Sequence, residues 1–131
     1  MAAVNSIETK SFGNDKQILI APELAFTIGC LVTNTGVSAD AEGKKVLKAG
    51  TPVGGEEADV LVNRQAVLAQ NTDAPQGVLL HDVDVTKGQA NATLVVEGTI
   101  DIEKLDEEVK TLVNKASANF KGVRVMSGSK M

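Results

Sequence analysis

The chain has 131 residues and a formal net charge of −4, a size at which one domain can bury a core without disulfides or metal ions. Its acidic balance disfavours contact with phosphate backbones, and the lack of Trp and Tyr removes the rings on which single-stranded nucleic acids and sugars stack. The single cysteine excludes an intramolecular disulfide framework and favours synthesis in a reducing compartment.

The sequence carries no recognisable signal for export or membrane insertion. No apolar run approaches the ~18 residues that a transmembrane helix needs. The first residues, Met1 to Ser6, lack a basic region followed by an apolar one. We therefore expect neither a nucleic acid nor a membrane as a partner.

The N-terminal segment differs from the rest of the chain. Polar residues interrupt any periodicity from Ser6 to Lys16, and the first apolar run is Ile18 to Ile20. Pro22 then blocks a helix and limits strand pairing. We predict that residues 1 to about 17 form an arm and do not belong to the core. An ordinary frayed terminus is the alternative.

The next elements are predicted to be strands and shaped loops. Phe26 to Val32 has the composition of a buried strand, in which Gly29 indicates a bulge or the close approach of another backbone. Lys44 to Lys48 is a candidate short strand, and residues 50–55 are too rich in Gly and Pro for a regular element. Residues 59–69 suggest two short strands joined by a polar turn, and periodicity does not separate these from a short helix.

A β-hairpin is predicted next. Two apolar strands, Gly77–Asp84 and Ala92–Glu97, alternate with period two and flank a polar link over residues 85–91. Strands of this length on either side of a short polar segment are typical of a hairpin.

An amphipathic helix is predicted over about residues 101–117. Apolar residues recur there at spacings of three and four, which places them on one face, and Asp101 can cap the free amides. An alternating strand, residues 120–126, closes a domain that spans residues 21–126, and residues 127–131 are expected to form a flexible tail. The whole is expected to be mainly β with one α-helix, an α+β fold.

Histidine meets carboxylates at one place only, His81-Asp82-Val83-Asp84. Successive side chains of a strand face opposite ways, so His81 is predicted to lie on the side of Val83 while the two aspartates point to the other side. The three cannot converge from one regular strand, and the chain has no second histidine to complete a metal site. The simpler interpretation is a strand that leaves the core for a polar turn.

Three further patterns fit structural roles better than chemical ones. Cys30 lies among apolar neighbours, which is typical of a buried thiol. The glycines near Gly43 and over residues 50–55 lack the lysine and hydroxyl spacing of a phosphate loop. The acidic run Asp101 to Glu108 lacks the ligand spacing and the glycine of a calcium loop. We therefore expect no catalytic residue, no cofactor, no metal and no enzymatic activity.

The order of these elements resembles the phage lambda-like head decoration family. A strand led by Gly77, a second strand over Ala92–Val96 followed by Gly98-Thr99, a helix, and the closing strand Phe120–Val125 occur there in the same order. The likeness covers about fifty residues and extends more loosely through Leu47–Val53, which is similar to a Pro-containing segment of the family. The chain departs from the family in its low aromatic content, a longer insertion around residues 34–46 and a different N-terminus.

This resemblance implies a small, tulip-like β-barrel domain of the lambda head decoration type with an extended N-terminal arm. It also implies a homotrimer, made in the host cytoplasm, that binds the outer surface of the virion head at three-fold and quasi-three-fold sites. The partner would be the major capsid protein, and the arm, matched here by Met1 to Ile20, would add an extended segment to capsid sheet edges. The residues of this segment with expected capsid contact are Ile7, Thr9, Phe12, Ile18, Leu19 and Ile20.

Such a protein would act mechanically. A ligand that binds only the assembled shell stabilises it against internal DNA pressure by mass action, and three arms of one trimer multiply the affinity. Two other interpretations stay open. One is another virion module, such as the base of a head fibre or a tail accessory protein. The other is a small trimeric β enzyme of the nucleotide-hydrolase type, for which the sequence offers no phosphate-binding motif.

Overall fold

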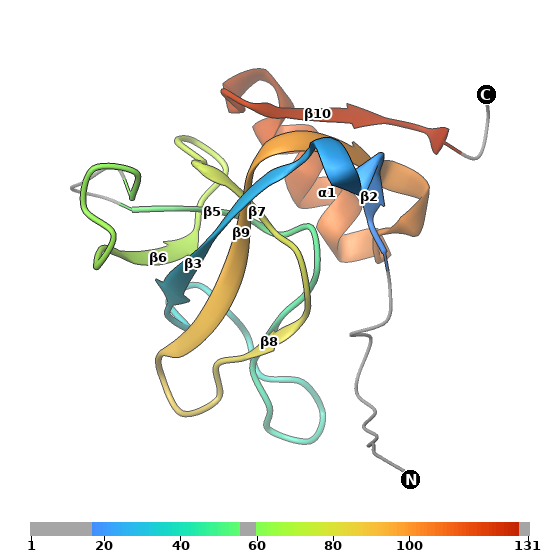
Figure 1. The fold of residues 1–131 in the computed structure, drawn as a ribbon. Coiled ribbons are helices and arrows are strands. Elements are labelled where there is room, and N and C mark those ends of the chain that lie inside the picture. Colours follow the sequence, from blue (N-terminus) through green and yellow to red (C-terminus); the bar gives the residue numbers. More distant parts are fainter. Residues whose placement is uncertain (1–16, 56–59, 129–131) are drawn as a thin grey trace, which may run out of the picture.

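The structure, a computed structural model, describes residues 17–55 and 60–128. It is mainly β, with one α-helix in these residues, and so has the α+β class that the sequence predicts (Figure 1). The helical segments are η1 (Pro22–Leu24), η2 (Ile102–Lys104), α1 (Glu107–Ala116) and η3 (Ser117–Asn119). The strands are β2 (Leu19–Ile20), β3 (Phe26–Val32), β4 (Val46–Leu47), β5 (Pro52–Gly54), β6 (Val67–Gln70), β7 (Gly77–Leu79), β8 (Val83–Asp84), β9 (Ala90–Asp101) and β10 (Val123–Met126).

Five of the strands pair in a closed ring. The long strand β9 pairs antiparallel with both β3 and β7. The ring continues from β7 to β5 and from β5 to β6, and β6 returns in parallel to β3. Side chains from these strands and the adjoining segments meet in a buried cluster, here called the ring core: Cys30, Val32, Leu47, Val53, Val60, Leu68, Leu79, Val85, Leu94 and Val96.

A second core lies between the sheet and the helix. Beyond the ring, β9 pairs antiparallel with β2 and parallel with β10. Parallel neighbours need a crossover connection, which η2, α1 and η3 supply. Successive side chains of β9 point alternately into the ring core and into this second core, because neighbouring residues of a strand face opposite ways. The helix core consists of Ile18, Leu19, Ala49, Val78, Val95, Ile100, Leu105, Val109, Val113 and Val123.

The helix α1 begins later than predicted. Extended backbone continues through Asp101 because Ile100 pairs with Leu19 of β2 and Val125 of β10. Asp101 does act as a cap, but for η2, whose Glu103 N–H donates to its Oδ1 at 3.0 Å. The α-helix therefore occupies only the later part of the predicted range.

The helix has the amphipathic form that the spacing predicts. Val109, Val113 and Ala116, four and three residues apart, are buried against the sheet. The first turn is acidic and the last carries Lys115, so the charges follow the helix dipole.

The predicted strand 77–84 is two short strands. β7 ends at Leu79 and β8 begins at Val83, and the bend between them lets β8 pair with β4 instead of β9. The antiparallel pairing expected of the hairpin is present between β7 and β9. The predicted strand Phe26–Val32 is confirmed as β3, but only its second half is largely buried, which corrects the expectation of a buried strand. Its bulge lies between Phe26 and Thr27 and not at Gly29.

Residues 50–55 contain a strand, which corrects the prediction of a loop. β5 is paired on both sides, with β6 and β7. Gly54 suits this crowded position because a Cβ there would collide with the carbonyl oxygen of Ala74. In the next segment only β6 is regular, because Asn63 accepts hydrogen bonds from Gln65 and Ala66 and so closes a turn.

Candidate functional site

The N-terminal segment is attached to the domain at β2. β2 pairs antiparallel with the end of β9, and the Ile18 carbonyl oxygen accepts a hydrogen bond from Asp101 N–H at 2.8 Å. Ile18 is completely buried, Leu19 is 8 % exposed and Ile20 is half-buried. These three residues therefore belong to the domain, which corrects the prediction that the arm extends to residue 20. The side chains of Ile18 and Leu19 pack into the helix core instead of leaving it.

The residues predicted to contact a capsid fall into two groups. Ile7, Thr9 and Phe12 lie outside the described residues. Of the other three, Ile18 and Leu19 face the helix core, so their side chains hold the segment in place and are not available to a partner. Ile20 is half-buried and lies outside this core, so its predicted contact stays a prediction.

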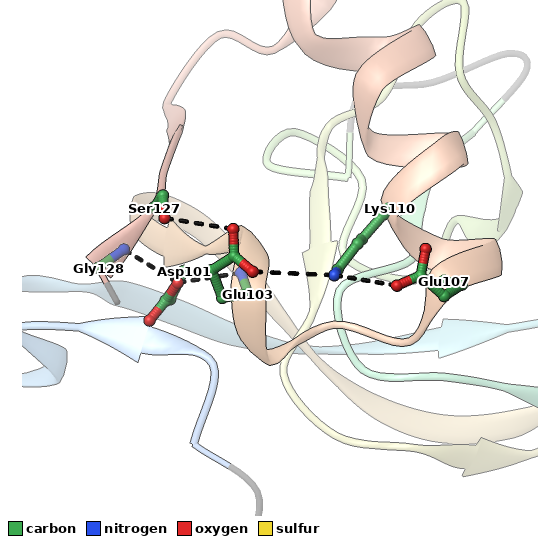
Figure 2. A network of polar contacts seen from close by, with 6 residues as sticks. All are labelled: Asp101, Glu103, Glu107, Lys110, Ser127 and Gly128. Atoms are coloured by element: carbon green, nitrogen blue, oxygen red, sulfur yellow. Dashed lines mark hydrogen bonds and ion pairs between the residues drawn. The ribbon is translucent and has the colours of Figure 1, made fainter. Parts of the chain in front are cut away.

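A polar network fixes the end of β9 to which β2 is attached (Figure 2). Asp101 is 7 % exposed, and its Oδ1 accepts hydrogen bonds from the N–H groups of Glu103 and Gly128, each at 3.0 Å. The Glu103 carboxylate accepts a hydrogen bond from Ser127 Oγ at 3.3 Å and lies 4.0 Å from Lys110 Nζ. The network joins β9, η2, α1 and the chain that follows β10, so part of the acidic run has a structural role. It also holds Ser127 and Gly128, which corrects the prediction that the flexible tail begins at residue 127.

The histidine and aspartates of the His81–Asp84 segment make separate contacts. Asp82 Oδ1 accepts a hydrogen bond from Ala49 N–H at 2.8 Å. Asp84 Oδ1 accepts two from Thr86, from Oγ1 at 2.6 Å and from N–H at 2.9 Å, and these bonds lower the pKa of Asp84. His81 Nδ1 is buried and has no hydrogen-bond partner in the described part of the chain. The three groups do not form an acid/base pair or a triad.

Asp82 and Asp84 border a hollow of about 370 Å³ with charges of both signs. The carboxylate of Asp40 accepts hydrogen bonds from the N–H groups of Glu42 and Lys44, at 2.8 and 3.0 Å, which lower the pKa of Asp40. Lys48 Nζ pairs with the carboxylates of Asp106 and Glu108, at 3.0 and 3.4 Å, so these charged groups of the hollow hold neighbouring segments together. Within residues 17–55 and 60–128, no three His, Cys, Asp or Glu side chains are placed to hold a metal ion. The lining residues are Ser38, Asp40, Lys44, Val46, Lys48, Asp82, Asp84 and Glu108.

Cys30 is a buried thiol. It is 7 % exposed in the ring core, and burial raises its pKa from 9.0 to about 11, although the charge of Arg64 acts in the opposite direction. A nucleophilic cysteine needs a lowered pKa and access to solvent. Cys30 therefore has the properties of a core residue.

The structure also shows a surface that the sequence pattern did not indicate. Most large apolar side chains of the described residues are buried, but Leu24, Phe26, Leu61 and Val62 are 79, 50, 51 and 86 % exposed. Phe26 belongs to a strand whose composition predicts burial, so the local sequence does not indicate that this side chain is exposed. Exposed apolar groups that gather in one place commonly mark a contact surface.

None of the helices in the described ranges is long and apolar enough to cross a membrane. The sequence matches no protein-family model and no curated protein.

Proposed function

We propose that this chain is a non-enzymatic head decoration protein of a bacteriophage. As a homotrimer it would bind the outside of an icosahedral capsid at three-fold and quasi-three-fold sites. The observation that carries the proposal is the order of elements: a strand led by Gly77, β9 with Gly98-Thr99, the helix α1, and β10 returning beside β9. This order supports the resemblance to the lambda-like family. The ring of five strands and the attachment at β2 are compatible with its tulip-like barrel and arm.

The attachment of β2 supports a mechanical role. Burial contributes about 1.5–3 kcal/mol for a large aliphatic side chain, so Ile18 and Leu19 together hold the segment with about 3–6 kcal/mol. The pairing of β2 with β9 adds to this, and the Asp101 network stiffens the same end of β9. A segment held in this way can transmit load between the domain and a partner.

In this proposal the partner is the major capsid protein, and residues 1–16 supply the segment that adds to its sheet edges. Binding only to the assembled shell stabilises it by mass action against internal DNA pressure. Three segments on one trimer bind together, so the affinity of the trimer exceeds that of one segment. The mechanism needs no catalytic group.

Deletion of residues 2–16 tests the role of the N-terminal segment. The deletion stops before Gln17, so β2 and the buried Ile18 and Leu19 stay in the protein. Full-length and deleted proteins would be mixed with expanded, emptied heads of the same phage, and the bound fraction measured by co-sedimentation.

We expect the deletion to abolish binding of an otherwise folded protein, as checked by circular dichroism. Undiminished binding would remove the segment from the proposal. A full-length protein that fails to bind expanded heads would count against the proposed function itself.

A further inference from the structure

The first half of β3 is paired on one side only. Residues 26–30 pair with β9, whereas β6 pairs only with the last two residues of β3. Across residues 17–55 and 60–128, no strand covers the other edge of residues 26–30. Unpaired backbone groups at such an edge are a template for pairing with another chain.

The backbone of Gly29 faces this open edge. Its carbonyl oxygen accepts a hydrogen bond from Arg64 Nη2 at 3.1 Å, from the loop before β6. Backbone groups alternate in direction along a strand, so those of Thr27, two residues earlier, face the same way. The exposed Arg64 side chain thus occupies one acceptor of the edge.

β3 itself carries no charged residue that would protect the edge, and the charged group that reaches it, Arg64, comes from the neighbouring loop. Natural edge strands are commonly blunted by charged residues, but no Asp, Glu, Lys or Arg occurs from Leu24 through Ala39. β10, by contrast, is an outer strand of the sheet and carries the exposed Arg124. The open edge of β3 is suited to be covered by a partner.

Gly29 has no reason to be glycine within its own chain. Its φ is not positive, and a Cβ at this position would meet no atom within 4 Å. Glycine inside a strand costs ~0.5–1 kcal/mol relative to Ala. Such a glycine fits a place where another backbone approaches closely.

Apolar side chains and a hollow surround the edge. Leu24 and Phe26, at the start of β3, are exposed, and so is Val62, two residues before the Arg64 that binds the edge. Leu61 lines a hollow of about 130 Å³. Glu97, opposite Phe26 in the β3–β9 ladder, lines the same hollow. We call this region, made of residues 23–30, 61–64 and the hollow, the β3 surface.

The charges of the β3 surface indicate what can bind there. Glu23 and Glu97 are balanced by Arg64 and Lys121, so the surface is neutral on a chain of net charge −4. Two copies of an acidic chain repel each other least where their charges cancel. Protruding side chains and a hollow on one surface also allow a head-to-tail contact between copies, which can close into a ring.

We propose that the β3 surface binds the folded domain of a second copy of this chain, with backbone pairing along residues 26–30. This inference rests on the homotrimer of the proposed function and assigns its contact surface.

Two substitutions test the surface in the full-length protein. Thr27→Pro removes a backbone N–H that faces the open edge and puts a proline ring in its place, so it obstructs strand pairing there without removing a hydrogen bond to β9. Val62→Glu places a charge on a side chain that is 86 % exposed. The control is Met126→Glu, an apolar side chain of β10 that is 40 % exposed away from this surface. Sedimentation velocity over a concentration series measures assembly.

We expect a trimer for the wild type and for Met126→Glu. Each β3-surface variant should raise the dissociation concentration at least tenfold, about 1.4 kcal/mol. The inference is overturned if both variants stay assembled like the wild type, or if the wild type is a monomer at all concentrations. If Val62→Glu stays trimeric but loses binding to heads, the surface contacts the capsid instead.

Deletion of residues 2–16 separates the remaining possibilities. We expect the deleted protein to stay trimeric. A monomer would assign the contact to residues 2–16 and overturn the pairing of folded domains. If the wild type does not bind heads but Val62→Glu still dissociates the trimer, the proposed function fails and the assigned surface stands.

Discussion

Replacing Asp101 tests how firmly the end of β9 is held. Asp101→Ala removes the carboxylate oxygen that accepts hydrogen bonds from the N–H groups of Glu103 and Gly128, each at 3.0 Å. Both bonds are partly buried, and the side chain is 7 % exposed. The substitution therefore releases η2 and the segment after β10 from the strand that also binds β2.

The expected loss of stability is about 3 kcal/mol. A hydrogen bond to a charged group contributes ~1.5–3 kcal/mol, and two such bonds would give ~3–6. We take the lower end because water can reach both donors once the carboxylate is gone. For a chain of this size this corresponds to a fall in Tm of roughly 12 °C. Asp101→Asn keeps an oxygen acceptor and should cost only about 1 kcal/mol.

Urea unfolding followed by far-UV circular dichroism measures the effect, because a chain without Trp or Tyr offers little fluorescence signal. Glu107→Ala is the matched control: this carboxylate belongs to the same acidic run, but it is 89 % exposed and pairs with Lys110 at 3.1 Å. Exposed pairs contribute ~0–1 kcal/mol. If Asp101→Ala loses no more stability than Glu107→Ala, the network does not hold the end of β9.

Three further measurements address the ring and its polar turns. Gly77→Ala should cost about 2–3 kcal/mol in urea unfolding, because the added Cβ collides with a carbonyl oxygen of β9. Gly29→Ala should change stability by less than ~1 kcal/mol, because its Cβ meets open space. Equal losses for the two variants would contradict the close packing of β7 against β9. The Cys30 thiol should titrate at about pH 11 when native, followed by thiolate absorbance that no tyrosine obscures, and a native midpoint near 9 would be inconsistent with burial. The pKa of Cys30 is higher in the folded protein than in the unfolded one. The contribution of the buried, protonated thiol to stability is therefore complete below pH 9 and is lost as pH rises toward 11. Thr86→Val removes a hydrogen bond to the charged form of Asp84, so the pKa of Asp84 should rise toward its usual value in carboxyl NMR titrations. The stability that this hydrogen bond contributes is present above the usual pKa of an aspartate and is lost at lower pH. An unchanged pKa would refute the role given to the Thr86 hydroxyl.

Local periodicity predicted the elements that carry a long pattern. α1 and β10 each follow a run of apolar residues with the period of a helix or a strand, and these runs decide which face is buried. The apolar composition of residues 26–32 predicted β3 as a strand but not which of its residues are exposed. The predicted boundaries are less accurate, because they depend on tertiary pairing. β9 continues through Asp101 because β2 and β10 pair with it there. Both strands are distant from β9 along the chain, so the local pattern does not reveal these pairings.

The burial of Ile18 and Leu19 could not be predicted from the sequence. A run of three apolar residues beside polar ones carries no periodicity, so it looks like part of an arm. Only the position of β9 and the helix core makes it a strand. The strand at Pro52–Gly54 was hidden for a related reason, because Gly and Pro there serve close packing and not a turn.

The candidate sites were predicted in part. The sequence indicates a buried Cys30, and the structure agrees. The alternation of side chains along a strand predicted that His81 and the aspartates would point to opposite sides. The regular strand β8 begins only at Val83, so the bend before it is what separates them. The β3 surface carried no sequence signal, because an exposed apolar strand has the same composition as a buried one.

Electron cryo-microscopy of expanded heads, reconstructed with and without added protein, tests the proposed function most directly. The proposal predicts added density on the outer surface at the three-fold and quasi-three-fold positions, with the domain oriented so that β2 and the segment before it face the shell. Density at the portal, on a fibre or along the tail, or no added density at saturating protein, would contradict it.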